Sequence, residues 1–296
     1  MAELAPLVTL IGEPWEGYGL VDSGGGRKLE RYGPYRFIRP EPQAMWAPAL
    51  PASAWEEAAG EFIPASDDDG GGRWYYNKPV PPDGWPLGWR EARFTASCTP
   101  FRHLGFFPDM APVWDWLRVQ LADKADPAFL NLFGYTGVGS QALAASGAAV
   151  THVDASKKSV AQARENAVLA GMGEHPIRWI VDDAGKFAAR EVRRGRRYDA
   201  ILLDPPKFGR GPNNERWQLE EGLAPLLADC RALLDTDSRA LFLTVYAVRM
   251  SALAIGELLA QLFADLPGRV ECGELAVREE TRGLLLPTAI FARWSR

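Results

Sequence analysis

The pattern of apolar and polar positions divides the chain into two regions of different character. From residue 110 onward, short apolar runs alternate with stretches in which apolar residues recur every three or four positions. The first of these stretches, DMAPVWDWLRVQLADK, has the spacing of an amphipathic helix. Before residue 110, turn residues separate short β-prone pieces such as RWYYNKPV and REARFTAS. The N-terminal region is therefore expected to be rich in β-structure.

The alternation after residue 110 follows the order of an α/β sheet. The apolar runs FLNLF, AVTHVD, IRWIVDD, YDAILLD and RALFLTVY indicate strands, and we expect helices in GSQALAASGA, SKKSVAQARENAVLAGM, AGKFAAREVRRG, ERWQLEEGLAPLLADCRALL and SALAIGELLAQLFADL. Strand–helix alternation predicts a Rossmann-like, mostly parallel sheet with helices on both faces. The last two runs, RVECGELAV and LLLPTAIFARW, lack an intervening helix and predict a hairpin at the sheet edge.

A chain of 296 residues is long enough for two modest domains. We expect a small β-rich domain over residues 1–109, as a region of substrate recognition or of contact with another subunit. The α/β domain then covers residues 110–296. The polar run PASDDDGGGR, from Pro64 to Arg73, predicts a hairpin loop within the first domain.

Composition argues against a membrane protein, a secreted protein and a metal site. No run approaches the roughly 18 apolar residues of a membrane helix, and the start MAELAPLVTLIGEPW lacks the basic residues of a signal peptide. Cys98, Cys230 and Cys272 are too few and too scattered for a disulfide framework or a zinc site. Three histidines without metal-binding spacing predict no metal. A reducing, cytoplasmic location is expected, and the oligomeric state is left open.

The charge distribution gives mixed signals about nucleic acid. The net charge is −5, and residues 1–110 carry 10 Lys and Arg against 15 Asp and Glu. Nucleic-acid binding needs local basic patches, and REVRRGRR, from Arg190 to Arg197, is a candidate with five arginines. The same run also fits the solvated end of a helix. Six of the eleven tryptophans lie in the first region, where they indicate either core packing or a base-stacking platform.

Candidate chemistry lies at the ends of the predicted strands, where open α/β sheets bind ligands. The first strand runs into Gly134-Tyr135-Thr136-Gly137-Val138-Gly139. Glycines permit a tight turn and a close approach of a ligand. The spacing is GxxGxG, whereas a dinucleotide turn has GxGxxG.

Carboxylates end the second and third strands. Asp154 follows the second strand at about the distance from the glycines at which an acid accepts hydrogen bonds from ribose hydroxyls. It could instead cap the next helix, a role for which Ser156 competes. Asp182 and Asp183 end the third strand, where a carboxylate can accept a hydrogen bond from an adenine amino group. We favour Asp183 for this role and keep Asp182 as the alternate.

The fourth strand ends in LLDPPKFGRG, from Leu202 to Gly211. Pro205 and Pro206 cannot continue a central strand and donate no backbone N–H, so carbonyl oxygens and the Asp204 carboxylate are expected to point into the site as acceptors. Phe208 is a candidate for stacking on a planar substrate. The charged candidates for contact with a phosphate are Lys207 and Arg210.

Taken together, these four strand ends resemble class I S-adenosylmethionine-dependent methyltransferases. LFGYTGVGS, VDASKKSVAQARENAVLAG and LLDPPKFGRG look like the bacterial enzymes that methylate cytosine C5 or guanine N7 in large-subunit rRNA. The resemblance covers roughly residues 100–296 and implies a seven-stranded sheet, S-adenosylmethionine as cofactor and RNA as substrate. It implies catalytic roles for Asp204, Pro205, Pro206 and Phe208. The cofactor-binding residues that it implies are Phe133, Gly134, Tyr135, Thr136, Gly137, Gly139, Asp154, Ala155, Ser156, Asp182, Asp183, Ala184 and Asp204.

The chain departs from this family pattern in two places. Methylation at cytosine C5 needs an attacking cysteine, and in the segment LFLTVYAVRMS Tyr246 stands where the family has it. A nitrogen acceptor with a lone pair is therefore more compatible. In addition, about 100 residues are too few for both the RNA-binding domain and the connecting domain that family members often carry.

Four functions remain open from the sequence. The first is methylation of a base in rRNA, with RNA binding and rRNA processing as its context. The second is methylation of a protein or a small molecule, which the acidic N-terminal region favours. A non-catalytic cofactor-binding module and a dinucleotide oxidoreductase are the others. The oxidoreductase is disfavoured by GxxGxG and has no use for the Asp-Pro-Pro loop.

Overall fold

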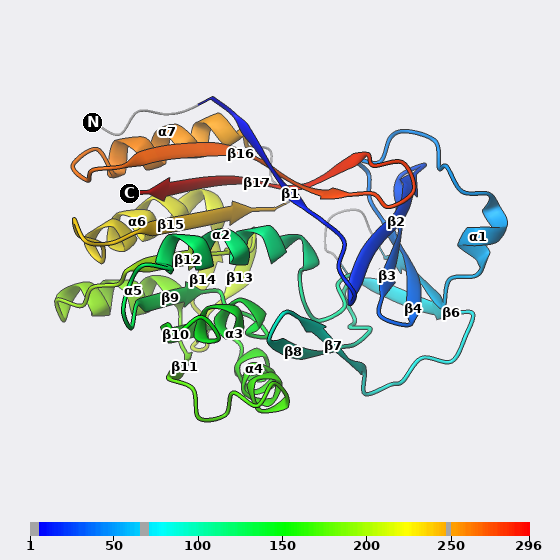
Figure 1. Ribbon diagram of the computed structural model, residues 1–296, viewed down its shortest axis with the longest axis horizontal. Coiled ribbons are helices and arrows are strands. Elements are labelled where there is room, and N and C mark those ends of the chain that lie inside the picture. Colours follow the sequence, from blue (N-terminus) through cyan, green and yellow to red (C-terminus); the bar gives the residue numbers. More distant parts are fainter. Residues whose placement is uncertain (1–5, 66–70, 247–249) are drawn as a thin grey trace. The chain divides into compact units, whose positions relative to one another are not determined.

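A computed structural model describes residues 6–65, 71–246 and 250–296 (Figure 1). The chain forms two compact units. The first consists of Met1–Leu10, Val113–Leu275 and Ala289–Arg296, and the second of Ile11–Pro112 and Ala276–Thr288. Within the described residues, no helix is both long enough and apolar enough to cross a membrane.

The first unit is built around a large, mostly parallel sheet. The parallel strands are β9 (Ala128–Leu132), β10 (Ala149–Asp154), β11 (Ile177–Val181), β12 (Ala200–Leu203) and β15 (Ala240–Val245). They are followed in the sheet by β17 (Leu285–Ser295), which is antiparallel to β15, then by β16 (Arg269–Arg278) and β1 (Val8–Gly12). The spatial order is β1-β16-β17-β15-β12-β9-β10-β11, which confirms the predicted Rossmann-like class.

Helices cover both faces of this sheet, as the strand–helix alternation predicted. On one face, Leu130 and Leu132 pack in a common core with α5 (Ala184–Arg193), α6 (Leu219–Ala232) and α7 (Ala252–Leu262). On the other face, Asn131 contacts α3 (Val138–Ala144). The helices α2 (Ala111–Leu121) and α4 (Lys157–Leu169) lie on this second face, where Trp116 packs on Phe242 and Ala163 lies beneath the glycine turn.

Three expectations need correction. The closing hairpin is not at the edge, because β1 pairs outside β16 and gives the sheet eight strands among the described residues instead of seven. The helix expected from Glu215 begins only at Leu219. The residues before it form a two-stranded ribbon of β13 (Phe208–Arg210) and β14 (Arg216–Gln218), which is antiparallel.

The second unit is rich in strands, as its composition predicted. Its larger sheet has the order β2-β3-β4-β5-β6, from strands β2 (Tyr18–Gly24), β3 (Arg27–Tyr32), β4 (Tyr35–Pro40), β5 (Gly60–Pro64) and β6 (Gly72–Tyr76). A separate hairpin pairs β7 (Trp85–Trp89) with β8 (Ala92–Ala96), and the short helices are α1 (Ala52–Glu56) and the 3₁₀ turn η1 (Pro108–Met110). β5 and β6 flank the predicted polar loop, of which residues 66–70 lie outside the described part.

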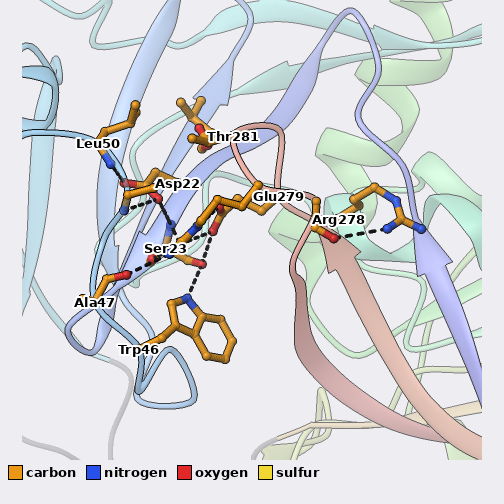
Figure 2. Close-up of polar contacts among 12 residues, drawn as sticks. Asp22, Ser23, Trp46, Ala47, Leu50, Arg278, Glu279 and Thr281 are labelled. Atoms are coloured by element: carbon orange, nitrogen blue, oxygen red, sulfur yellow. Dashed lines mark hydrogen bonds and ion pairs between the residues drawn. The ribbon is translucent and has the colours of Figure 1, made fainter.

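The turn between β16 and β17 belongs to this second unit and is held there by buried polar groups (Figure 2). Asp22 is fully buried, and its carboxylate accepts hydrogen bonds from the backbone N–H groups of Ala49 and Leu50 and from the Trp55 indole. An Arg282 guanidinium nitrogen lies 3.1 Å from the same carboxylate. A buried carboxylate is tolerated only with such partners, so the turn and the β2 strand depend on each other.

The tryptophans of the second unit lie buried or half-buried in its packing. Trp55, Trp85 and Trp89 are buried, and Trp74 is half-buried with its indole N–H donating to the carbonyl of Thr99. Exposed aromatic side chains in this unit are Tyr75, Tyr76 and Phe101. The tryptophans therefore fit the core-packing interpretation better than a stacking platform.

Candidate functional site

The candidate site lies where the strand order of the parallel sheet reverses. β9 pairs with β10 on one side and with β12 on the other, so the chain returns across the first strand after leaving β11. The Asp204 backbone N–H donates to the carbonyl of Leu132 over 3.4 Å, which joins the loops that follow β12 and β9. Such a reversal opens a crevice at the carboxyl ends of the strands. Predicted site residues about 70 positions apart thus become neighbours.

The glycine turn after β9 has an unusual backbone. Phe133, Tyr135 and Gly137 have φ values of 59°, 47° and 81°, in the left-handed region. A side chain at the glycines would collide with the protein itself: a Cβ on Gly134 would lie 2.5 Å from His152 Nδ1, and one on Gly137 2.8 Å from the Ala163 Cβ. A Cβ on Gly139 would lie 2.9 Å from Trp114 Nε1. The packing of the turn against the rest of the protein therefore requires glycine at these positions, independently of any ligand that binds there.

A buried polar row supports this turn. Asn131 Nδ2 donates to Ser140 Oγ over 3.0 Å, and Ser140 Oγ lies 2.9 Å from His152 Nδ1. Burial lowers the pKa of His152 to about 3, so the imidazole is neutral near pH 7. Asn166 Nδ2 donates to the carbonyl of Thr136 over 2.9 Å. Hydrogen bonds among residues of two strands and two helices therefore fix the glycine turn.

Asp154 binds the same turn from the end of β10. Its Oδ2 accepts from the Tyr135 backbone N–H over 2.9 Å, and its Oδ1 accepts from the Ser156 N–H over 2.8 Å. The N-cap of α4 is Ser156, whose Oγ accepts a hydrogen bond from the Ser159 N–H. Asp154 is therefore not the residue that caps this helix. Burial raises the pKa of Asp154, and the two backbone N–H groups oppose this. Ala155 lies between the two residues at the same strand end.

The two acids after β11 differ in what they bind. Asp182 Oδ2 lies 2.5 Å from Arg190 Nη2, and its Oδ1 accepts from the Asp183 backbone N–H. Asp183 caps α5 by accepting from the Lys186 N–H at Oδ1 over 2.9 Å, while its Oδ2 has no hydrogen-bond partner among the described residues. Ala184 begins α5 and is buried. The geometry leaves Asp183 with more free acceptor capacity than Asp182.

Asp204 is held by a residue that the sequence did not single out. Thr244, fully buried at the end of β15, donates its hydroxyl to Asp204 Oδ1. The register of β12 on β15 pairs Leu203 with Leu243, which sets the next residues side by side. A single polar position near the end of an apolar strand was the only available signal.

The loop after Asp204 is anchored by Trp217. Its indole N–H donates to the Pro206 carbonyl over 2.7 Å. The centre of its ring lies 5.1 Å from the centre of the Phe133 ring. The Leu219 N–H donates to the Lys207 carbonyl over 3.0 Å. The Pro206 and Lys207 carbonyls are thus already bound within the protein. Pro205, which is buried, provides the candidate carbonyl of the proline pair.

The exposed side chains follow the proline pair directly. Phe208 is 59% exposed, and Lys207 Nζ lies 5.2 Å from the centre of its ring. Arg210 is exposed on the same strand. An exposed aromatic ring with cations beside it is the arrangement expected for contact with a base and a phosphate.

The arginine run fits the end of a helix. α5 ends at Arg193, with Arg190 bound to Asp182 and Arg194 Nη1 3.0 Å from Glu191 Oε1. Part of its charge is therefore neutralised inside the protein.

The three thiols are not poised as nucleophiles. Burial raises the pKa of Cys98 to about 11 and also raises the pKa of Cys230 and of Cys272. Cys230 and Cys272 belong to the apolar core behind the sheet. Since the thiolate is the reactive form, none of the three cysteines meets the requirement for attack on a cytosine ring.

Comparison with solved structures gives relatives that align along nearly the whole chain. The SAM-dependent methyltransferase from Agrobacterium tumefaciens is 44% identical, with alignment over 99% of this chain and 95% of that one and a TM-score of 0.94. A protein called SMU.776, solved in complex with SAH (S-adenosylhomocysteine), has a TM-score of 0.70 over 95% of this chain and 76% of its own. At 18% identity, it shares the fold.

Curated relatives match only part of the chain. The ribosomal RNA large subunit methyltransferase K/L of Magnetococcus marinus is 32% identical over 154 residues, which are 51% of this chain and 20% of that protein. The ribosomal RNA large subunit methyltransferase I of Aeromonas salmonicida is 36% identical over 107 residues, or 36% of this chain and 24% of that protein. The aligned part thus spans about a fifth to a quarter of these relatives. The family model "Conserved hypothetical protein 95" matches residues 112–220.

Proposed function

The chain belongs to the S-adenosylmethionine-dependent methyltransferases, and from this premise we propose that it methylates a base in RNA, with ribosomal RNA as the natural substrate. One observation carries the proposal. At the strand reversal, the Asp204-Pro205-Pro206 loop and the exposed Phe208 ring follow the strand that neighbours the glycine turn. The partial relatives that are named as rRNA methyltransferases support RNA as the substrate class.

The residues of the first unit fit the cofactor in their chemistry. S-adenosylmethionine, when bound, supplies a methyl group on a positively charged sulfur. We assign its amino-acid end to the glycine turn from Phe133 to Gly139. The Asp154 carboxylate, which retains lone pairs beyond its two backbone hydrogen bonds, accepts from the ribose hydroxyls.

The adenine end is assigned to Asp183. Its Oδ2 has no partner among the described residues and can accept from the exocyclic amino group, while Asp182 is engaged with Arg190. Ser156 and Ala184, which cap or begin the helices after these acids, border the adenosine with their backbone. Free acceptor capacity is the reason for preferring Asp183.

The acceptor side is assigned to the loop after β12. Asp204 accepts a hydrogen bond from the substrate amine, together with the carbonyl of Pro205, and Phe208 stacks on the base. These contacts position a nitrogen lone pair for in-line transfer, which makes orientation the main contribution of the protein. A nitrogen acceptor needs no covalent adduct, in agreement with three protonated thiols.

A protein or small-molecule substrate is the second candidate. The observation that favours it is the acidic balance of residues 1–110, which does not attract a polyanion. In either case we assign the β-rich second unit, Ile11–Pro112 with Ala276–Thr288, to substrate recognition or subunit contact. The first unit, which holds the α/β sheet, is assigned to methyl transfer.

Nucleosides from rRNA decide between the two candidates. The gene is deleted, rRNA from both strains is digested, and the nucleosides are compared by mass spectrometry. We expect one methylated nucleoside to disappear on deletion and to return with the wild-type gene but not with Asp204→Ala. An unchanged digest would move the assignment to a protein or small molecule.

A further inference from the structure

We propose that the exposed face of the β13–β14 ribbon binds the phosphate backbone of the RNA substrate, with Arg210 and Arg216 as the phosphate ligands. This face, called here the ribbon face, consists of Phe208, Arg210, Arg216 and Gln218. The inference rests on the proposed function, because it takes RNA as the substrate. It adds Arg216, which the sequence motifs did not include, and a specific geometry for the phosphate.

The orientation of the ribbon follows from its register. Phe208 pairs with Gln218, Gly209 with Trp217, and Arg210 with Arg216. Side chains alternate between the two faces of a strand. Trp217 is 9% exposed and bound to the Pro206 carbonyl, so the face that it shares with Gly209 is turned toward the protein. The ribbon face is therefore turned toward solvent.

Two arginines stand directly opposite each other on this face. Like charges in directly opposed positions of an antiparallel pair are destabilising. Neither Arg210 nor Arg216 has a carboxylate within salt-bridge distance in the part of the chain that is described, and both are exposed. Each is bound instead to a neutral amide: Arg210 Nη1 to Asn214 Oδ1 over 2.8 Å, and Arg216 Nη2 to Gln218 Oε1 over 2.7 Å. The amides orient the guanidinium groups without neutralising them.

The nearest acid is used elsewhere. Glu215, adjacent to Arg216, lies 2.7 Å from Lys186 Nζ and accepts from the Asn213 N–H. The hydrogen bond from Lys186 lowers the pKa of Glu215 to about 2, in accordance with this pairing. Lys207, above the Phe208 ring, adds a third positive charge next to the ribbon face. Among the described residues, the cationic pair therefore lacks an anion.

A phosphodiester supplies the missing anion. Its two non-bridging oxygens can accept from both guanidinium groups, which converts a repulsive pair into a bridged one. Phe208, two residues before Arg210 on the same face, is then in place to stack on a base of the same strand. A single RNA strand thus fits the combination of one ring and two arginines better than an isolated phosphate ion does.

The test measures RNA affinity separately from catalysis. A fluorescent 12-nucleotide single-stranded RNA is titrated with the full-length protein in the presence of S-adenosylhomocysteine, at several chloride concentrations. The variants are Arg210→Gln, Arg216→Gln and the double variant, with Arg164→Gln as control on an exposed position of α4. We expect the double variant to bind at least about tenfold more weakly and the salt slope to fall by about 0.7 for each phosphate that is no longer bound. The control should match the wild type.

Equal affinity and equal salt slope for the double variant and the wild type would overturn the proposal. Inorganic phosphate forms a second arm, compared with chloride at equal ionic strength. If the variants lose RNA affinity and inorganic phosphate displaces no RNA from the wild type beyond the chloride effect, the site takes a backbone phosphate, as proposed. If the variants lose competition by inorganic phosphate but keep RNA affinity, the RNA assignment is wrong.

Two further readouts separate this site from a structural role and from the proposed function. Because each single substitution removes a repulsive pair, the melting temperature without RNA should equal or exceed that of the wild type, whereas a structural role would lower it. If rRNA digests show no change on gene deletion while the variants still lose RNA affinity, the proposed rRNA methylation fails and the phosphate site stands. If a methylated nucleoside disappears on gene deletion but the variants keep their RNA affinity, the proposed rRNA methylation stands and the phosphate site is wrong.

Discussion

The hydroxyl of Thr244 donates a hydrogen bond to the carboxylate of Asp204, across the neighbouring strands β15 and β12. Thr244 is fully buried, whereas Asp204 reaches the site at the strand reversal. The bond therefore fixes the orientation of the acid that we assign to the substrate amine.

Removing this hydroxyl should slow methyl transfer without weakening cofactor binding. We expect Thr244→Val to lower kcat about 10- to 100-fold, because a hydrogen bond to a charged group contributes roughly 1.5–3 kcal/mol. Thr244→Ser, which keeps the hydroxyl, should stay within about threefold of the wild type. Steady-state kinetics and calorimetry with S-adenosylmethionine measure the two effects. A valine variant with normal kcat would show that Thr244 does not position Asp204.

The glycine turn offers a second prediction. A Cβ at Gly134 would lie 2.5 Å from both Nδ1 and Cε1 of His152. Gly134→Ala should therefore destabilise the protein by about 1–3 kcal/mol, as overpacking does, and should weaken S-adenosylmethionine binding. Gly173→Ala is the control, because its nearest contact would be 3.7 Å from Val168. Urea unfolding and calorimetry measure both effects, and a fully stable Gly134→Ala protein would contradict the packing argument.

Asp154 predicts a pH dependence of cofactor binding. Burial raises its pKa above the ordinary value of the carboxyl. The ionised carboxylate accepts hydrogen bonds from the ribose hydroxyls. The affinity for S-adenosylmethionine is therefore highest above this pKa and falls as the pH drops through it. An ordinary aspartate has a pKa of about 3.9. Because the pKa of Asp154 is raised, the loss of affinity should begin at a higher pH than an ordinary aspartate would give. Calorimetry from pH 7.5 downward measures it, and Asp154→Asn should bind weakly and without this dependence. If the affinity of the wild type for the cofactor did not change with pH, the assignment of Asp154 to the ribose hydroxyls would be wrong.

The second unit should depend on Asp22. Its buried carboxylate is bound by two backbone N–H groups, the Trp55 indole and Arg282. We expect Asp22→Ala to destabilise this unit by about 1–3 kcal/mol, because it leaves two backbone N–H groups and the Trp55 indole without their acceptor, while Arg282 keeps its ion pair with Glu279. The exposed Asp83→Ala is the control. Hydrogen exchange of the β2–β6 sheet reports the loss, and equal protection in both variants would show that the network contributes little.

The strands and helices of the parallel sheet were predictable because each central strand is a short apolar run and each helix has its own period. The strand-end acids Asp154, Asp183 and Asp204 were predictable as a set for the same reason, since parallel strands bring their carboxyl ends to one edge. In contrast, β1 pairs with a strand more than 250 residues away, and nothing in VTLIG indicates that partner.

Local patterns could not reveal the features that depend on register. Thr244 meets Asp204 only because Leu203 pairs with Leu243. The strands of the β13–β14 ribbon have three residues each, which is too short for a periodic signal, and Trp217 looked like part of the following helix. The opposition of Arg210 and Arg216 is likewise a consequence of pairing that the sequence does not display.

We assign to Asp204 and its loop the positioning of a base of ribosomal RNA for methyl transfer. The most direct measurement incubates the purified protein with S-adenosylmethionine carrying a radioactive methyl group and with rRNA from the deletion strain. We expect label in one nucleoside of the RNA with the wild type, and none with an Asp204→Ala protein that still binds the cofactor. Unlabelled RNA with the wild type, or full labelling by Asp204→Ala, would contradict this assignment.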